Sequence, residues 1–185
     1  TSFEELEAII QAVRAHRTLS FDLETTSLNP LDATIVGFAV SWAPGMAAYI
    51  PVGHTKGPQL ATVDVLEQLA PLLRDSSIRI YGQNLKYDLK VLLNRFNLEG
   101  IRVYRDSMIA AYLLDPGRRQ LGLDHLALEV FGHVTIKFKE LLAKAGVDEI
   151  SAVSIEETTV YACEDADVAL RLGIHYETEL TQLQL

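Results

Sequence analysis

The sequence predicts an α/β domain built on a mixed sheet of about five strands. β-rich runs come early in the chain and include an antiparallel hairpin, a helix–strand–helix stretch follows, and the pattern from residue 107 onward is helical. This order favours a sheet flanked by helices. The 185 residues, 49% of them hydrophobic and 22% charged, fit a single domain with a sizeable core.

Capping patterns and apolar periodicity place the individual elements. Ser2 with Glu5, and later Ser154 with Glu157, have the spacing of capping boxes, and Asn84 is expected to cap a helix that runs to Phe96. The expected helices are 3–16, 63–74, 85–96, 107–114, 123–131, 137–145 and a long one that begins after Ser154. The expected strands are 18–24, 34–42, 46–52, 78–81 and 101–104, with a hairpin turn at Ala43-Pro44-Gly45.

Composition narrows the possible functions. The net charge of −9 argues against a free-standing nucleic-acid binder, because neutralising phosphates is the main term in such affinity. It does not exclude an enzyme that acts on nucleic acid, because metal ions bound by clustered carboxylates invert the local charge. With one cysteine, no apolar run near 18 residues and no signal-like start, a cytoplasmic protein without membrane association is expected.

Three short segments bring together residue types that bind metal ions. Asp22 and Glu24 lie two apart at the end of a predicted strand and therefore share a face. Asp88 lies four residues after Asn84, and Asp165 lies four residues after Tyr161, so each pair shares a face of a helix. Each segment alone has a structural interpretation as a turn, a cap or a solvated helix face, and the combination is what favours function.

The chemistry that suits these residues is two-metal phosphodiester hydrolysis. Two ions about 3.5–4 Å apart can activate water and neutralise the charged oxygens of an in-line displacement. Mg²⁺ and Mn²⁺ prefer carboxylate oxygens and water, and a site without Cys or His suits them better than zinc. Asp22 and Glu24 would form the floor, and Asp88 and Asp165 would close it from the sides. Tyr161 could orient a water by donating a hydrogen bond.

Longer stretches around these residues resemble a known family. Phe21–Leu28, Gly82–Asp88 and Tyr161–Asp167 look like the three motifs of the proofreading 3′–5′ exonucleases, which have a ribonuclease H-like fold. Together with Ala48–His54 they resemble the proofreading domain of bacterial DNA polymerase I over essentially the whole chain. Tyr161 matches the subclass that has tyrosine in the third motif.

The resemblance implies roles for individual residues. Asp22, Glu24 and Asp165 would hold the first metal, Asp22 would bridge to a second, and Asp88 would act on the second through water. Tyr161 would position the nucleophilic water. The residues implied to contact the substrate are Leu28 and Phe138, against the last bases, and Thr25, Gln83 and Asn84, near the terminal nucleotide. Arg118 matches an arginine that contacts phosphate, but the loop Gly117–Gly122 is two residues longer than the family pattern, so Arg119 is an alternative.

The resulting hypothesis is a Mg²⁺- or Mn²⁺-dependent exonuclease that removes nucleoside monophosphates from single-stranded or frayed DNA 3′ ends. Residues 1–185 would form a single exonuclease domain of a longer, nucleoid-associated bacterial polymerase, partnered with the polymerase domain of the same parent chain, and a monomer is expected. Three alternatives stay open: an RNA-trimming enzyme like ribonuclease D, a non-catalytic module that binds 3′ ends or docks a partner, and a phosphatase acting on small phosphoesters.

Overall fold

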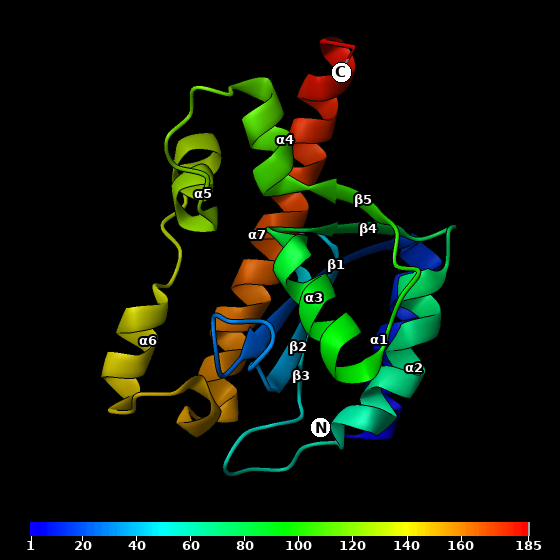
Figure 1. Cartoon of the computed structure of the whole chain (residues 1–185), viewed down its shortest axis with the longest axis vertical. Helices are drawn as coiled ribbons and strands as arrows, with labels where there is room; N and C mark the ends of the chain where they lie inside the picture. The colour runs from blue at the N-terminus through cyan, green and yellow to red at the C-terminus, as the bar shows by residue number, and fades with distance from the viewer. Residues whose placement is uncertain (185) are drawn as a thin grey trace.

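The computed structural model describes residues 1–184 and contains a five-stranded mixed sheet with helices on both faces (Figure 1). The strands are β1 (Thr18–Thr25), β2 (Ile35–Ala43), β3 (Met46–Pro51), β4 (Arg79–Gly82) and β5 (Val103–Asp106). Their order in the sheet is β3-β2-β1-β4-β5. β2 runs antiparallel to both β1 and β3, whereas β4 is parallel to β1 and β5. The predicted α/β class and mixed five-stranded sheet are confirmed.

The helices follow the predicted spacing closely. They are α1 (Phe3–His16), α2 (Thr62–Arg74), α3 (Leu85–Phe96), α4 (Ser107–Leu114), α5 (Leu123–Phe131), α6 (Phe138–Ala145) and α7 (Ile155–Gln182), with a 3₁₀ turn η1 (Ile150–Ala152). Both Ser2 and Ser154 accept a hydrogen bond from the backbone N–H three residues on, as predicted. None of the helices in residues 1–184 is long and apolar enough to cross a membrane.

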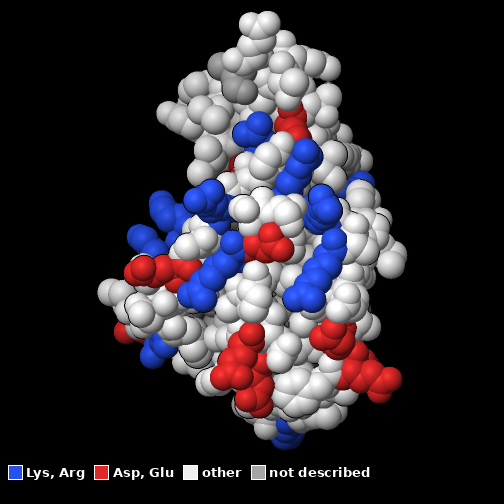
Figure 2. Space-filling model, turned by 90° about the vertical axis from the view of Figure 1, so that its right-hand side faces the viewer, with Lys and Arg blue, Asp and Glu red and all other residues white. Residues whose placement is uncertain are grey.

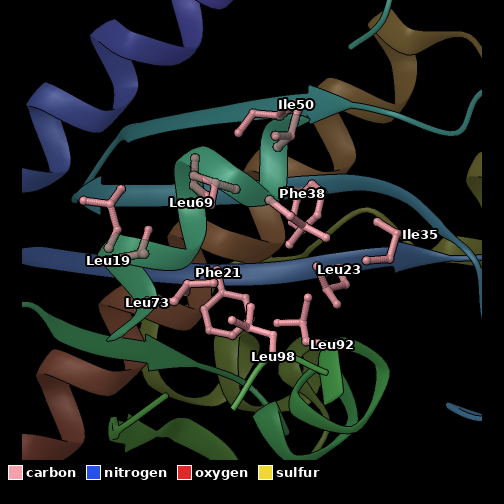
Figure 3. Close-up of a cluster of buried hydrophobic side chains, with 14 of the residues drawn as sticks. Leu19, Phe21, Leu23, Ile35, Phe38, Ile50, Leu69, Leu73, Leu92 and Leu98 are labelled. Carbon is pink, nitrogen blue, oxygen red and sulfur yellow. The ribbon is translucent and has the colours of Figure 1, made fainter. Parts of the chain in front are cut away.

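The two faces of the sheet are covered by different helices. The main apolar core joins one face of the strands to α1, α2 and α3, and Figure 3 shows Phe21 and Leu23 of β1 pointing into it. Because side chains alternate along a strand, Asp22 and Glu24 point to the opposite face. There α7 crosses the sheet, with Ala162 packed against Ala39.

Two predictions about the strand–helix junctions were wrong. The side chain of Asn84 makes no capping hydrogen bond, and its backbone is left-handed, with φ 55°. The carboxylate of Asp106 caps α3 instead, accepting from the backbone N–H of Asn84 (3.1 Å) and of Leu85 (2.8 Å). β5 also begins two residues later than expected, which brings Asp106 level with Gly82 at the ends of the two strands.

Candidate active site

The acidic site begins on β1. In the antiparallel pairing, Asp22 lies opposite Ala39 and Glu24 lies opposite Gly37. These partners are small, so they leave room above the sheet for the two carboxylates. The side chains of Asp22 and Glu24 face α7, and Glu24 is only 5% exposed.

Helix α7 completes a cluster of three carboxylates. Asp165 lies one turn after Tyr161, on the side of α7 that faces the sheet, and the small residues Ala162 and Ala166 allow the helix to approach closely. One carboxylate oxygen each of Asp22, Glu24 and Asp165 lie within 4.8 Å of one another. The sequence-based prediction that these three residues converge is confirmed.

Asp88 lies beside this cluster but is not part of it. It is 2% exposed, and its Oδ1 accepts a hydrogen bond of 3.0 Å from the backbone N–H of Leu23. It is close enough for its charge to contribute to raising the pKa of Glu24. The carboxylate of Asp88 is thus held by the backbone of the strand that carries Asp22 and Glu24, outside the group of three.

Burial and mutual repulsion shift the protonation of all four acids. Burial raises the pKa of Asp22 to about 6, and burial together with the charge of Asp22 raises that of Asp165 to about 8. The pKa of Glu24 rises well above its usual range through burial and then through Asp22 and Asp165. Burial, followed by the charge of Asp22, also raises the pKa of Asp88.

The cluster fits hard divalent cations. Within the described chain, Oε1 of Glu24 is buried and has no hydrogen-bond partner, a costly arrangement unless another ligand satisfies it. The donors are carboxylate oxygens, which Mg²⁺ and Mn²⁺ prefer. Cations bound here would remove the repulsion that raises these pKa values.

Tyr161 lies close to the acidic residues Asp165 and Glu24. Burial, and then the charges of Asp165 and Glu24, raise the pKa of its hydroxyl far above neutrality. The group therefore stays protonated and can act as a hydrogen-bond donor. Its ring lies 6.1 Å, centroid to centroid, from that of Phe138 at the start of α6.

A cleft opens from the acids to the surface. Of the residues predicted to contact substrate, those that line it are Thr25, Leu28, Gln83, Asn84 and Phe138. Leu28 is 96% exposed and Phe138 is 41% exposed, so two apolar groups stand at the edge of an acidic site. Neither packs in the core. Gln83 is fixed by donating from Nε2 to the carbonyl of Leu121 at 2.7 Å.

The structure does not place the predicted arginines among the residues that line this cleft. Arg118 forms an ion pair with Glu129 at 2.7 Å, and its side chain is 16% exposed. Arg119 is exposed in the same loop. A phosphate contact by Arg118 would compete with its ion pair to Glu129.

Sequence reasoning missed the groups that hold the cleft walls. The hydroxyl of Tyr87 hydrogen-bonds Thr25 and the carbonyl of Ser27, which ties α3 to the loop that carries Leu28. The position of Tyr87 between Lys86 and Asp88, in the motif already singled out, was an available signal.

His54 is buried and has a structural role. Its Nε2 hydrogen-bonds the Tyr49 hydroxyl at 2.8 Å and its Nδ1 hydrogen-bonds the Val153 carbonyl at 3.0 Å. It thereby joins β3 to the segment after η1, and two neighbours of that segment, Glu149 and Ile150, line the cleft. No sequence pattern linked residue 54 to residue 153.

Comparison with known proteins agrees with this geometry. Residues 1–180 match the 3′–5′ exonuclease family. DNA polymerase I of Pseudomonas aeruginosa is 37% identical over 172 residues, which cover 90% of this chain and 19% of that protein. The chain thus spans about a fifth of this relative's length.

Solved structures show the same fold at lower identity. Escherichia coli RNase D, an exoribonuclease, superposes with a TM-score of 0.74 at 21% identity over 98% of this chain and 44% of that one. Brucella melitensis NrnC with bound Mg²⁺ gives a TM-score of 0.70 at 24% identity over 90% of this chain and 74% of that one. The fold is therefore that of ribonuclease H-like exonucleases, and the match over residues 1–180 places this chain in the 3′–5′ exonuclease family represented in bacterial DNA polymerase I.

Proposed function

We propose that this domain removes nucleoside monophosphates from the 3′ ends of single-stranded or frayed DNA by two-metal hydrolysis. The observation that carries the proposal is the convergence of Asp22, Glu24 and Asp165 within 4.8 Å in a cleft that also has exposed apolar groups. DNA is the favoured substrate because the relatives at 30–37% identity are DNA polymerases. The RNA-specific neighbours support the fold alone.

The metal ions would be held by Asp22, Glu24 and Asp165, with Asp88 acting through the second coordination sphere. When bound, divalent cations supply charge neutralisation at the scissile phosphate and lower the pKa of water. Mg²⁺ bound to the structural neighbour NrnC is consistent with this choice. Glu24, whose Oε1 lacks a partner, offers an oxygen ready to coordinate.

Other side chains would position the substrate. Leu28 and Phe138 would pack against the last bases, and such stacking tolerates any sequence. Thr25, Gln83 and Asn84, which line the cleft, would contact the terminal nucleotide. Tyr161 would donate a hydrogen bond that orients the attacking water, because its raised pKa makes it a poor base at neutral pH.

In its biological setting we propose that the domain edits the 3′ end for a polymerase domain of the same parent chain. Relatives in which the matching segment makes up 18–19% of a DNA polymerase I support this arrangement. The domain would need no partner copy, since every acid of the proposed site comes from one chain.

The test is release of mononucleotides from 3′-labelled single-stranded DNA with Mg²⁺. Asp22→Asn is expected to lower kcat at least about 1,000-fold, since a metal bridge is lost. Asp64→Asn, at an exposed position on α2, is the matched control and should retain full activity. Equal rates for Asp22→Asn and wild type would refute the hydrolase.

A separate experiment tests whether the substrate is DNA or RNA. A matched RNA oligonucleotide differs locally only by the 2′ hydroxyl. Faster release from RNA than from DNA would replace the DNA assignment with RNA trimming. Metal binding by calorimetry without any hydrolysis would instead support a module that only binds 3′ ends.

A further inference from the structure

Positive charge in this acidic chain is concentrated outside the cleft. Seven of its 16 Lys and Arg residues lie between residues 74 and 105, a stretch with three acidic residues, whereas the whole chain carries −9. One of those three acids, Asp88, is buried beside the site and does not screen the surface. Figure 2 shows many Lys and Arg side chains across the middle of one side of the molecule, with a few acidic side chains among them and more grouped below.

Five of these residues, on α3 and on strands β4 and β5 or directly before them, are here called the basic face: Arg79, Lys86, Lys90, Arg102 and Arg105. Lys86 and Lys90 line a shallow groove between α3 and β5 that also contains Val103, the strand residue between Arg102 and Tyr104. The guanidinium carbons of Arg79 and Arg105 lie 4.9 and 5.3 Å from the centre of the Tyr104 ring. The cations therefore follow the outer side of α3 and the free edge of the sheet.

Most of this charge is uncompensated. Within residues 1–184, Arg79 is the one member of the basic face with a carboxylate partner, Glu177 at 3.6 Å. Lys86, Lys90 and Arg102 are exposed. Unpaired cations grouped in this way repel one another, and the phosphates of a polyanion would neutralise them. The counterions that the polyanion releases on binding would add to the affinity.

The basic face adjoins the cleft through α3. Asn84, directly before this helix, lines the cleft, while Lys86 and Lys90 lie on the neighbouring side of the same helix. Lys86 and Lys90 are one turn apart, about 6 Å along the helix axis. A nucleic-acid strand presents a phosphate about every 3.4 Å of its axis, so a backbone lying along α3 would bring phosphates to both lysines.

We infer that the basic face binds the phosphate backbone of the polynucleotide whose 3′ end occupies the cleft. This inference rests on the proposed function, because it assigns the part of the substrate behind the reacting end. The cleft would then supply chemistry with little net electrostatic attraction, and the basic face would supply affinity that depends on salt but not on sequence. The backbone could belong to a single strand or to a duplex with a frayed end.

The test compares two pairs of charge reversals that change the net charge equally. Lys86→Glu/Lys90→Glu alters the basic face, and Lys56→Glu/Lys144→Glu alters exposed lysines elsewhere. Binding is measured in EDTA, where no hydrolysis occurs, by fluorescence anisotropy of a labelled 20-nucleotide single strand and of a hairpin duplex with a four-nucleotide 3′ overhang. The salt dependence of Kd is recorded for each.

The basic-face variant should bind at least about ten-fold more weakly than the control, and the slope of log K against log salt should fall by about two, one for each lysine. A loss confined to the hairpin identifies duplex as the ligand, a loss confined to the 20-nucleotide strand identifies single strand, and an equal loss on both shows that the basic face binds either backbone. Hydrolysis of a four-nucleotide substrate should be unchanged. Binding is measured without catalysis. A wild-type protein that hydrolyses no substrate would therefore refute the proposed exonuclease activity and leave the binding comparison valid.

Equal Kd values and salt slopes for the two variants would overturn the inference and leave the basic face as a surface for an acidic protein. Lys86→Gln/Lys90→Gln distinguishes loss of charge from loss of folding, since it removes the two positive charges without adding negative charge near Asp106. It should give a smaller loss of affinity in the same direction and an unchanged melting temperature.

Discussion

Replacing Gly37 with alanine is expected to push the Tyr49 ring out of its place beside Glu24. An added Cβ would lie 2.2 Å from both Cζ and the hydroxyl oxygen of Tyr49. Normal carbon contacts are about 3.5 Å, so the ring has to move by more than about 1 Å. It cannot do so freely, because its hydroxyl is hydrogen-bonded to His54 at 2.8 Å and the ring packs against Ala162.

The expected loss of stability follows from these contacts. Overpacking costs about 1–3 kcal/mol, and breaking the buried bond to His54 adds about 1 kcal/mol. Alanine regains about 0.5–1 kcal/mol over glycine in a strand. Gly37→Ala should therefore lower the free energy of unfolding by about 1–3.5 kcal/mol, a large part of a typical stability of about 5–15 kcal/mol.

Urea unfolding followed by the fluorescence of Trp42 measures this loss, and a double-mutant cycle isolates its cause. In a Tyr49→Leu background the atoms that clash are gone, so Gly37→Ala should cost less than about 0.5 kcal/mol or stabilise. If the substitution costs the same in both backgrounds, the close contact with Tyr49 is not the reason. Because Gly37 pairs with Glu24, weaker Mg²⁺ binding should accompany the single substitution.

Three further predictions concern the acids and the groups that hold the cleft. The pKa of Asp22 is raised to about 6 and that of Asp165 to about 8. The metal-free folded protein therefore keeps protons on these carboxyls that the unfolded chain releases near pH 4. Its melting temperature in EDTA should fall from pH 5 to pH 8. Saturating Mg²⁺ should flatten that decline, and a rise with pH in EDTA would contradict the reasoning. Asp106→Ala removes the acceptor for backbone N–H groups at the starts of both α3 and α4. Chemical denaturation should show that the free energy of unfolding falls by about 2–4 kcal/mol. A fall of less than about 1 kcal/mol would show that water replaces the carboxylate. Tyr87→Phe removes the hydrogen bond from the Tyr87 hydroxyl to the carbonyl of Ser27 and so loosens the loop that carries Leu28. Steady-state kinetics should show KM raised several-fold with kcat nearly unchanged. A fall in kcat alone would place Tyr87 in the chemical step.

The elements and the acidic cluster could be predicted because their signals are local. The helix at 123–131 has the predicted bounds, and the spacing of Asp22 and Glu24 fixes their shared face through strand geometry alone. Tyr161 and Asp165 follow in the same way from the period of a helix. That these two pairs meet required the resemblance to a family, since spacing within one segment says nothing about its distance from another.

The predictions that failed depend on contacts between distant segments. Asn84 has the composition of a cap, but Asp106, 22 residues later, supplies the acceptor, which only the parallel pairing of β4 and β5 makes possible. The pairing of Arg118 with Glu129 on the next helix was likewise not indicated by sequence position, and the phosphate contact of Arg118 stays a prediction. A sequence pattern lists the side chains able to make such bonds, and tertiary packing selects among them.

The close seating of α7 on the sheet makes the site intolerant of changes in helix length. Its small residues Ala162, Ala166 and Gly173 meet the strands, and a Cβ at Gly173 would lie 2.5 Å from the ring of Tyr81. Inserting one residue between Asp165 and Gly173 would rotate one half of α7 against the other by about 100°. Either Asp165 would no longer lie near Asp22, or Gly173 would no longer pack against Tyr81. Insertions and deletions should therefore be tolerated in the loops around this helix and not within it.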